Sequence, residues 1–167
     1  MLSDNGFLFN LSDLSYYFPE NSSSNRWSFI SSYSQLERSD AVVFVINDKA
    51  YYGLGEDAND GSELNDFYEF DPSKISSPEG PWTRLADLNI AVDGNCSNIL
   101  NRGRKEAVAF ALNGKGYVLT GLEGTSSSFL NDVWEFDPDT KEWTCLEKKF
   151  LGGIRGGASS FVIGNKA

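Results

Sequence analysis

Arginine and carboxylate side chains recur at matched positions in this chain and are its main candidates for chemistry. Arg38 and Arg104 are 66 residues apart, and an acid, Asp40 or Glu106, follows each of them two residues on. A third arginine, Arg155, opens a similar stretch. Because a guanidinium presents a planar fork of donors that matches a carboxylate, these five residues could bind an acidic ligand. The alternative is structural: each arginine bonds loop carbonyls or an acid, with Asp40 and Glu106 as natural internal partners.

The composition excludes several other chemistries. The chain of 167 residues has no histidine, which removes Ser-His-Asp and Cys-His catalysis and zinc sites that need histidine. Residues 56–63 are acidic, but their glycine is out of register for a calcium loop. The two cysteines, Cys96 and Cys145, are too few for a disulfide framework; one disulfide and two unpaired thiols both stay open, and we expect unpaired thiols. We assign no catalytic residue, no metal site and no cofactor.

The charge and the hydropathy exclude two classes of partner. Fourteen Lys and Arg against 24 Asp and Glu give a net charge of −10, which disfavours nucleic acid and anionic membrane surfaces. No apolar run reaches the ~18 residues that a membrane span needs. The N-terminus lacks the basic start and apolar run of a signal peptide.

The chain repeats itself. Residues 38–55 match 104–121, and 64–72 match 130–138, all at an offset of 66; residues 155–167 open a third copy. Arg155 follows Arg104 by only 51 residues, because the loops after Pro72 and Trp82 are 5 and 10 residues longer than their counterparts in the second copy. The basic unit is therefore ~50 residues long.

Each unit reads as four short strands and no helix. The two-residue turns Asn47-Asp48 and Asn113-Gly114 predict hairpins, and Asp-Pro ends each third strand. The expected strands are 41–46, 49–54, 66–70 and 82–85 in one unit, and 107–112, 115–120, 132–136 and 143–147 in the next.

This repeat resembles the kelch motif, one blade of a β-propeller. The resemblance is carried by the arginine before strand one, the glycine after strand two (Gly55, Gly121), the aromatic residue three positions before Asp-Pro (Tyr68, Trp134) and the fourth-strand tryptophan (Trp27, Trp82, Trp143). The chain departs from the usual glycine pair after strand two, with Leu54 or Thr120 at the first position.

The resemblance implies an all-β fold of four-stranded antiparallel kelch blades. Residues 1–37 would be a degenerate partial blade, 38–103 a blade with loop insertions, 104–154 a blade, and 155–167 the start of another. These are about three blades' worth, whereas propellers close with four to eight. We therefore expect an incomplete propeller belonging to a longer protein, with open blade edges capable of self-association.

The resemblance also frames the function. The strand-one arginines would stand at the mouth of the central channel, and the insertion 86–103 would lie on the same face. We expect Tyr68, Trp82, Trp134 and Trp143 to pack between blades rather than to stack on sugars; Tyr16, Tyr17 and Tyr33 are the candidates for exposure.

The leading interpretation is a non-enzymatic binding module that presents its loops to a protein, a peptide or an acidic glycan. The alternatives are a sugar-acid isomerase similar to N-acetylneuraminate epimerase, with Glu106 and Arg104 in its site, and a purely architectural domain. Residues 84–88 and 165–167 look like bacterial cell-surface kelch proteins, which favours a surface or periplasmic location.

Overall fold

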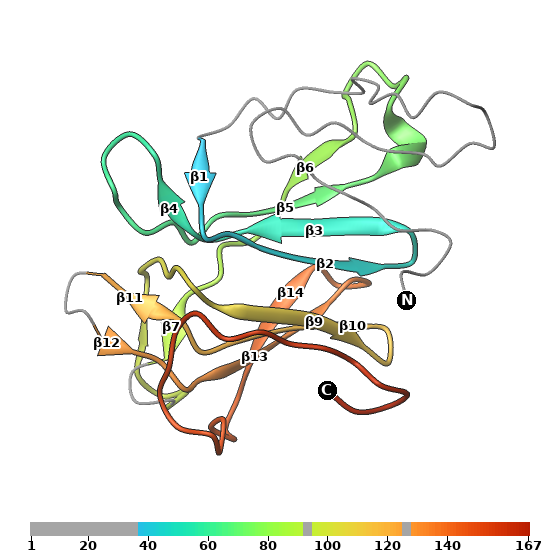
Figure 1. Cartoon of the computed structure of the whole chain (residues 1–167). Helices are drawn as coiled ribbons and strands as arrows, with labels where there is room; N and C mark the ends of the chain where they lie inside the picture. The colour runs from blue at the N-terminus through green and yellow to red at the C-terminus, as the bar shows by residue number, and fades with distance from the viewer. Residues whose placement is uncertain (1–36, 92–94, 125–127) are drawn as a thin grey trace, which may run out of the picture.

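The computed structural model describes residues 37–91, 95–124 and 128–167, and these form two four-stranded antiparallel sheets (Figure 1). The sheet of the first unit (38–103) contains β2 (Val42–Ile46), β3 (Lys49–Gly53), β5 (Phe67–Phe70) and β6 (Trp82–Arg84), in that order. The sheet of the second unit (104–154) contains β9 (Val108–Leu112), β10 (Lys115–Leu119), β13 (Val133–Asp137) and β14 (Glu142–Leu146). The expected all-β fold of four-stranded blades is confirmed.

Three two-stranded sheets accompany the blades. They are β1 (Arg38–Ser39) with β4 (Glu56–Asp57), β7 (Ile90–Ala91) with β8 (Ile99–Leu100), and β11 (Leu122–Glu123) with β12 (Ser128–Phe129). The β1–β4 and β11–β12 pairs lie at the end of the blades where β2 and β9 begin, on the left of Figure 1. We call this end, which carries Arg38, Arg104 and Arg155, the arginine end.

Local sequence explains the strand pairing. Asn47 and Asp48 have φ of 50° and 61°, and Asn113 and Gly114 have φ of 52° and 75°, the left-handed pair that a two-residue hairpin turn requires. The turns set the registers Ile46↔Lys49 and Leu112↔Lys115. The single helical element in the described ranges is a 3₁₀ turn at Pro72–Lys74 after the third strand, and no helix there is long and apolar enough to cross a membrane.

The core lies between the two sheets. Phe44 and Phe67 of the first sheet meet Trp143 of the second edge-on, with ring centroids 6.4 and 5.0 Å away. Gly116 lies against the Phe44 ring where a Cβ would collide, so a glycine is required for this approach. Trp134 is also in this cluster, which confirms the predicted packing between blades for Trp134 and Trp143. Tyr16, Tyr17 and Tyr33 fall outside the described residues.

The units follow one another side by side. β2 lies next to β9 (Figure 1), and residues after Arg155 lie next to β9 in turn, with Gly157 N donating to Glu106 O and Ser160 Oγ to Ala109 O. Residues 155–167 form no extended strand beyond an isolated bridge between Ile163 and Lys166. The partial blade predicted for 1–37 falls almost wholly outside the described residues, so these boundaries stay predictions.

Candidate functional site

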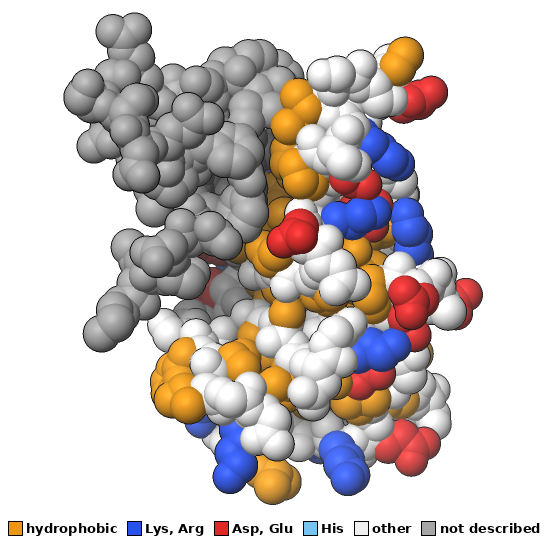
Figure 2. Space-filling view, turned by 90° about the vertical axis from the view of Figure 1, so that its right-hand side faces the viewer, with side chains coloured by type: hydrophobic (Ala, Val, Ile, Leu, Met, Phe, Trp, Pro, Cys, Tyr) orange, Lys and Arg blue, Asp and Glu red, His pale blue; other side chains and the backbone are white. Residues whose placement is uncertain are grey.

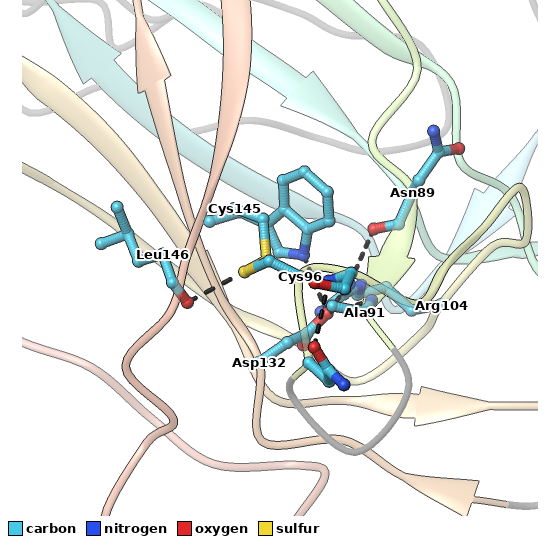
Figure 3. The surroundings of a disulfide bond; sticks show 10 residues. Asn89, Ala91, Cys96, Arg104, Asp132, Cys145 and Leu146 are labelled. Atoms are coloured by element: carbon cyan, nitrogen blue, oxygen red, sulfur yellow. Dashed lines mark hydrogen bonds and ion pairs between the residues drawn. A yellow bond between two sulfur atoms is a disulfide. The ribbon is translucent and has the colours of Figure 1, made fainter.

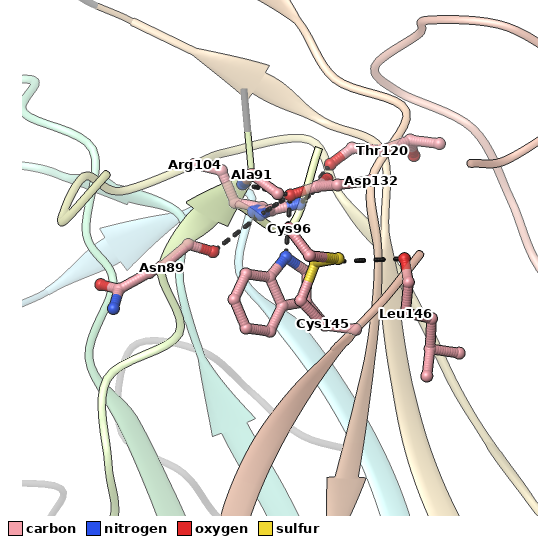
Figure 4. Close-up of polar contacts among 9 residues, drawn as sticks. Asn89, Ala91, Cys96, Arg104, Thr120, Asp132, Cys145 and Leu146 are labelled. Carbon is pink, nitrogen blue, oxygen red and sulfur yellow. Dashed lines mark hydrogen bonds and ion pairs between the residues drawn. A yellow bond between two sulfur atoms is a disulfide. The ribbon is translucent and has the colours of Figure 1, made fainter. Parts of the chain in front are cut away.

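The guanidinium of Arg104 is fully buried in a network of acceptors (Figure 4). Its two terminal nitrogens donate to the two oxygens of Asp132, both at 2.7 Å, and also to the carbonyls of Thr120 (3.0 Å) and Asn89 (2.9 Å). Asp132 accepts two further bonds, from Trp134 Nε1 at 2.8 Å and Ala91 N at 2.9 Å. These hydrogen bonds offset much of the cost of burying both charges, while the Nε of Arg104 has no partner among the described residues.

Arg38 repeats the arrangement in the first unit. It forms a bidentate pair with Asp66 at 2.5 and 2.8 Å, donates to Leu54 O at 3.1 Å and lies over the Tyr52 ring. The bidentate partners are thus Asp66 and Asp132 in place of the expected Asp40 and Glu106. Each lies 28 residues after its arginine in a repeated Leu-Asn-Asp, and this equal spacing was the available signal. Burial of both guanidiniums favours the structural role, and a ligand-binding role for them remains a prediction.

Asp40 and Glu106 lie at a bend between the arginine and strand one. Their φ angles are 54° and 55°, and Gly157, the same position of the third copy, has φ of 65°. The repeated feature is therefore a left-handed bend, which an L-residue adopts at some cost. Asp40 is exposed and Glu106 half-buried, so both carboxylates stay available at the surface.

Leu54 and Thr120, the two departures from the glycine pair, also lie in the left-handed region. Their φ angles are 60° and 61°, and their carbonyls are the ones that accept from Arg38 and Arg104. Strand two must therefore turn sharply here to present a carbonyl to the buried guanidinium. Glycine would adopt this conformation without the strain that an L-residue suffers.

Arg155 joins the second unit through its backbone as Arg104 joins the first. Gly121 N donates to Arg155 O at 2.8 Å, as Gly55 N donates to Arg104 O at 2.9 Å. The Arg155 side chain, however, is exposed: it donates to Gly152 O and stacks on the Phe150 ring, 5.3 Å from its centroid. Of the three arginines, this one presents its charge to solvent.

The insertion 86–103 is tied to the second unit (Figure 3). Leu88 N donates to Asn65 O, and Ala91 N to Asp132, before a disulfide joins Cys96 to Cys145 of β14 with 5.7 Å between the Cα atoms. The expectation of two unpaired thiols is therefore wrong. A fourth-strand cysteine and a long loop meet in space, and sequence spacing cannot show such a meeting. Through Asn89 O and Ala91 N, the insertion reaches the buried Arg104–Asp132 pair.

Ion pairs brace the loops between the two units. Lys105 pairs with Glu56 and Glu63, and Arg102 pairs with Glu123 at 2.9 Å. The acidic stretch 56–63 is thus partly neutralised by the second unit rather than fully solvated. Within the described ranges, no group of acidic or cysteine side chains could hold a metal ion.

One cluster at the arginine end combines an aromatic ring with charge. A Cβ built on Gly156 would lie 3.1 Å from Phe129 Cε1 and 2.6 Å from Glu106 Oε2, so both side chains close on the backbone beside Arg155. Phe129 is 46% exposed. The structure therefore brings the side chains of Glu106 and Phe129 to the backbone next to Arg155, whose guanidinium lies over Phe150. The sequence carried no signal for Phe129.

The opposite end, seen in Figure 2, carries basic and acidic side chains close together. Lys49 pairs with Asp71 at 3.0 Å and Lys115 with Asp137 at 2.5 Å. A hydrogen bond from the Ser73 hydroxyl, helped by Lys49, lowers the pKa of Asp71 to about 2. Because these charges satisfy one another, this end is the weaker candidate for a site.

Comparisons with known proteins agree with the repeat. A family model of the kelch motif matches residues 103–149. N-acetylneuraminate epimerase of Yersinia enterocolitica is 30% identical over 127 residues, which cover 73% of this chain and 27% of the relative. An F-box/kelch-repeat protein of Arabidopsis thaliana is 30% identical over 113 residues, or 60% of this chain and 25% of the relative.

The solved structure of YjhT superposes with a TM-score of 0.56 at 21% identity, over 77% of this chain and 32% of that one, and so shares the fold. The chain spans about a quarter of the length of the curated relatives it matches. The motif match and the shared fold agree: residues 103–149 form a kelch motif, and this chain has the fold of kelch-type β-propeller blades.

Proposed function

We propose that this chain is a non-enzymatic binding module whose arginine end holds a protein, a peptide or an acidic glycan. The observation that carries the proposal is the cluster of Phe129, Glu106 and Arg155, where three segments of the chain meet at one exposed place. An exposed aromatic ring and a carboxylate, on the backbone next to a residue with an exposed guanidinium, offer stacking, an acceptor and a charged donor at one end of the chain. The guanidinium favours a ligand that carries a carboxylate.

The surroundings support a binding role because covalent and ionic links join the loops around the cluster. The insertion is held by the disulfide to β14, and its backbone caps the Arg104–Asp132 pair. The Lys105 ion pairs lock the loops of the two units together. Loops fixed before a ligand arrives lose less entropy on binding. In this proposal Arg38 and Arg104 shape the face, while Arg155 with Asp40 and Glu106 contacts the ligand.

Calorimetric titration tests the proposal. The probes are N-acetylneuraminate, galacturonate and a glutamate-rich peptide. If one of these probes binds, Phe129→Ala and Arg155→Ala should each weaken its affinity by about tenfold, which corresponds to the loss of one good contact. Lys74→Ala, which removes an exposed cation at the opposite end, is the matched control. Equal affinity in all variants, with folding intact, would show that the ligand binds elsewhere.

A sugar-acid isomerase is the second candidate, because two relatives are named N-acetylneuraminate epimerase. In that case Glu106 would move a proton beside Arg155, which anchors the substrate carboxylate. Proton NMR of N-acetylneuraminate distinguishes the two: accelerated interconversion, lost in Glu106→Gln, replaces the binding proposal with the enzymatic one. If the chain shows no binding and no turnover with these probes, the third interpretation, an architectural domain, is favoured.

A further inference from the structure

The disulfide between Cys96 and Cys145 links the two units covalently. Cys96 belongs to the insertion 86–103 of the first unit, and Cys145 lies on β14, an edge strand of the second sheet (Figure 3). Cys145 packs against the core between the sheets and is paired directly with Trp134 across the strands. The link therefore lies where the insertion of one unit meets the edge of the other.

Neither cysteine belongs to the repeated scaffold. Alignment of the fourth-strand tryptophans places Arg84 at the position of Cys145, and Arg84 is exposed and pairs with Asp87 at 2.6 Å. Cys96 lies between Trp82 and the next strand-one arginine, in a stretch that is 10 residues longer than its counterpart in the second unit. The first sheet forms four strands without a cysteine in any of them. A unit of this repeat therefore folds without such a link.

The insertion is anchored to other segments on both sides of Cys96. Before it, the amides of Leu88 and Ala91 donate at 2.8 and 2.9 Å to acceptors outside the insertion. After it, Arg102 forms an ion pair with Glu123 at 2.9 Å. Strands β7 and β8 pair with each other between these anchors. Most of the insertion is thus held by contacts that do not depend on the disulfide.

Residues 95–98, which we call the Cys96 turn, are attached differently. Asn98 N donates to Asn95 O at 2.8 Å, and Ser97 N donates to the side chain of Asn95 at 3.0 Å. In the described part of the chain these bonds stay inside the turn, and no hydrogen bond or ion pair joins the turn to another element. The disulfide to β14 is its one such link there. Loss of the disulfide would therefore free this turn and leave the anchors in place.

The surroundings of the two sulfur atoms suit both redox states. Cys96 and Cys145 are half-buried, and the other residues of the Cys96 turn are exposed, so a small dithiol can approach the disulfide. Cys145 Sγ lies 4.0 Å from Leu146 O (Figure 4), so the thiol that reduction forms there has a weak acceptor within reach. The thiol of Cys96 would be carried by an exposed turn.

We propose that the Cys96–Cys145 disulfide is a redox-sensitive switch that a dithiol opens. One thiolate of the dithiol attacks a sulfur of the disulfide and expels the other sulfur as a thiolate. The second thiol of the dithiol then attacks the mixed disulfide and closes a cyclic disulfide. Two electrons and two protons thereby pass from the dithiol to Cys96 and Cys145.

Reduction releases the Cys96 turn from β14 while both units stay folded. A disulfide stabilises mainly by restricting the unfolded chain, so its loss lowers the free energy of unfolding without requiring a change in the folded core. The anchors at Leu88, Ala91 and Arg102 hold the remainder of the insertion. The switch does not depend on the proposed ligand or on the cluster at the arginine end.

NMR relaxation of the 167-residue chain, before and after reduction with dithiothreitol, tests the proposal. The backbone order parameters of Ser97 and Asn98 are expected to fall from about 0.85, typical of a rigid backbone, to below about 0.6. Those of Leu88 and Ala91 in the insertion, and of Val118 in β10, should not change. Reoxidation with oxidised glutathione should restore the starting values, because a switch must be reversible.

The variant with Cys96→Ser and Cys145→Ser is the matched control. It should show the low order parameters of the reduced chain both with and without dithiothreitol, which excludes an effect of the reagent itself. If this variant does not fold, the reduced chain alkylated with iodoacetamide takes its place, since both sulfur atoms are then blocked. Mass spectrometry should find both cysteines alkylated after reduction of the folded chain and neither before it.

Three results would overturn the proposal. A disulfide that dithiothreitol reduces only in the presence of urea would show that the sulfur atoms are out of reach in the folded chain. Loss of order throughout β10 and β13 on reduction would make the disulfide a structural link on which the fold depends. Unchanged order parameters at Ser97 and Asn98 after complete reduction would show that other contacts hold the turn.

Discussion

The left-handed residues that end strand two allow one substitution to be predicted with opposite signs in the two units. Thr120 and Leu54 share nearly the same φ, 61° and 60°, and the same task, since each carbonyl accepts from a buried arginine. Glycine removes the clash that an L-residue suffers at this angle. We expect Thr120→Gly to stabilise the protein and Leu54→Gly to destabilise it.

The magnitudes follow from what each side chain contributes. Relief of the left-handed conformation is worth about 1–2 kcal/mol in either unit. The Thr120 hydroxyl is buried and has no hydrogen-bond partner among the described residues. Its removal should therefore stabilise the folded state by about 1–3 kcal/mol. Against this stand about 0.8 kcal/mol for one buried methyl and roughly 0.5–1 kcal/mol for the freedom of glycine in the unfolded chain. Thr120→Gly should therefore raise the free energy of unfolding by about 2 kcal/mol.

Leu54→Gly relieves the same backbone strain, but it loses far more free energy from the removal of the buried side chain. Its side chain is fully buried in the core between the sheets, and truncation of a buried leucine costs about 2–5 kcal/mol. Leu54→Gly should therefore lower the free energy of unfolding by about 2–3 kcal/mol. The difference between the two variants arises from the side chain, because the backbone term is common to both.

Urea unfolding followed by tryptophan fluorescence measures both variants, since Trp134 and Trp143 lie in the core. Thr120→Ala separates the contributions, because it removes the hydroxyl but keeps the strained backbone, and it should fall between the wild type and Thr120→Gly. A Thr120→Gly protein that is less stable than the wild type would refute the reasoning. It would mean that the threonine side chain supports the turn.

Three further predictions concern buried charge, pH and the disulfide. Asp132→Ala leaves the buried Arg104 guanidinium without its counter-charge and should cost about 3–5 kcal/mol in a denaturant titration. Because the pKa of Asp71 is lowered to about 2, the stability that its charge provides is present above pH ~4 and should be lost between pH ~4 and ~2; acid unfolding of Asp71→Asn, which lacks this loss, checks the sign. Replacing Cys96 and Cys145 by serine opens a link between residues 49 apart and should cost about 4 kcal/mol in the unfolding free energy measured without reductant.

Much of the fold could be predicted because the signals are local. The turns Asn47-Asp48 and Asn113-Gly114 set the hairpins, and every predicted strand lies within two residues of the observed one at each end. Trp134 and Trp143 were also placed between the sheets correctly. Their placement follows from alternation along a strand, which depends only on neighbours in the sequence.

The candidate site was less predictable because its contacts join distant segments. Asp40 and Glu106 were expected to neutralise the arginines because they are close in sequence, but both lie at a bend ahead of strand one. Asp66 and Asp132 neutralise the arginines instead. Each aspartate reaches its arginine only after the chain has passed through two intervening strands. Phe129 entered the site through its approach to the backbone of Gly156, and neither residue recurs at the matched position of another unit.

The sequence by itself determined the repeat, the eight strands of the two four-stranded sheets with their pairing, and the kelch motif, because turn residues, alternation and a constant offset are properties of the chain read in order. The tertiary structure alone decided which carboxylates neutralise Arg38 and Arg104, that Cys96 meets Cys145, and that Lys141 crosses to Glu69. Each of these contacts joins residues 28 or more positions apart. Such contacts form only where the packing of the sheets brings the side chains within reach, and burial then makes each pairing energetically necessary.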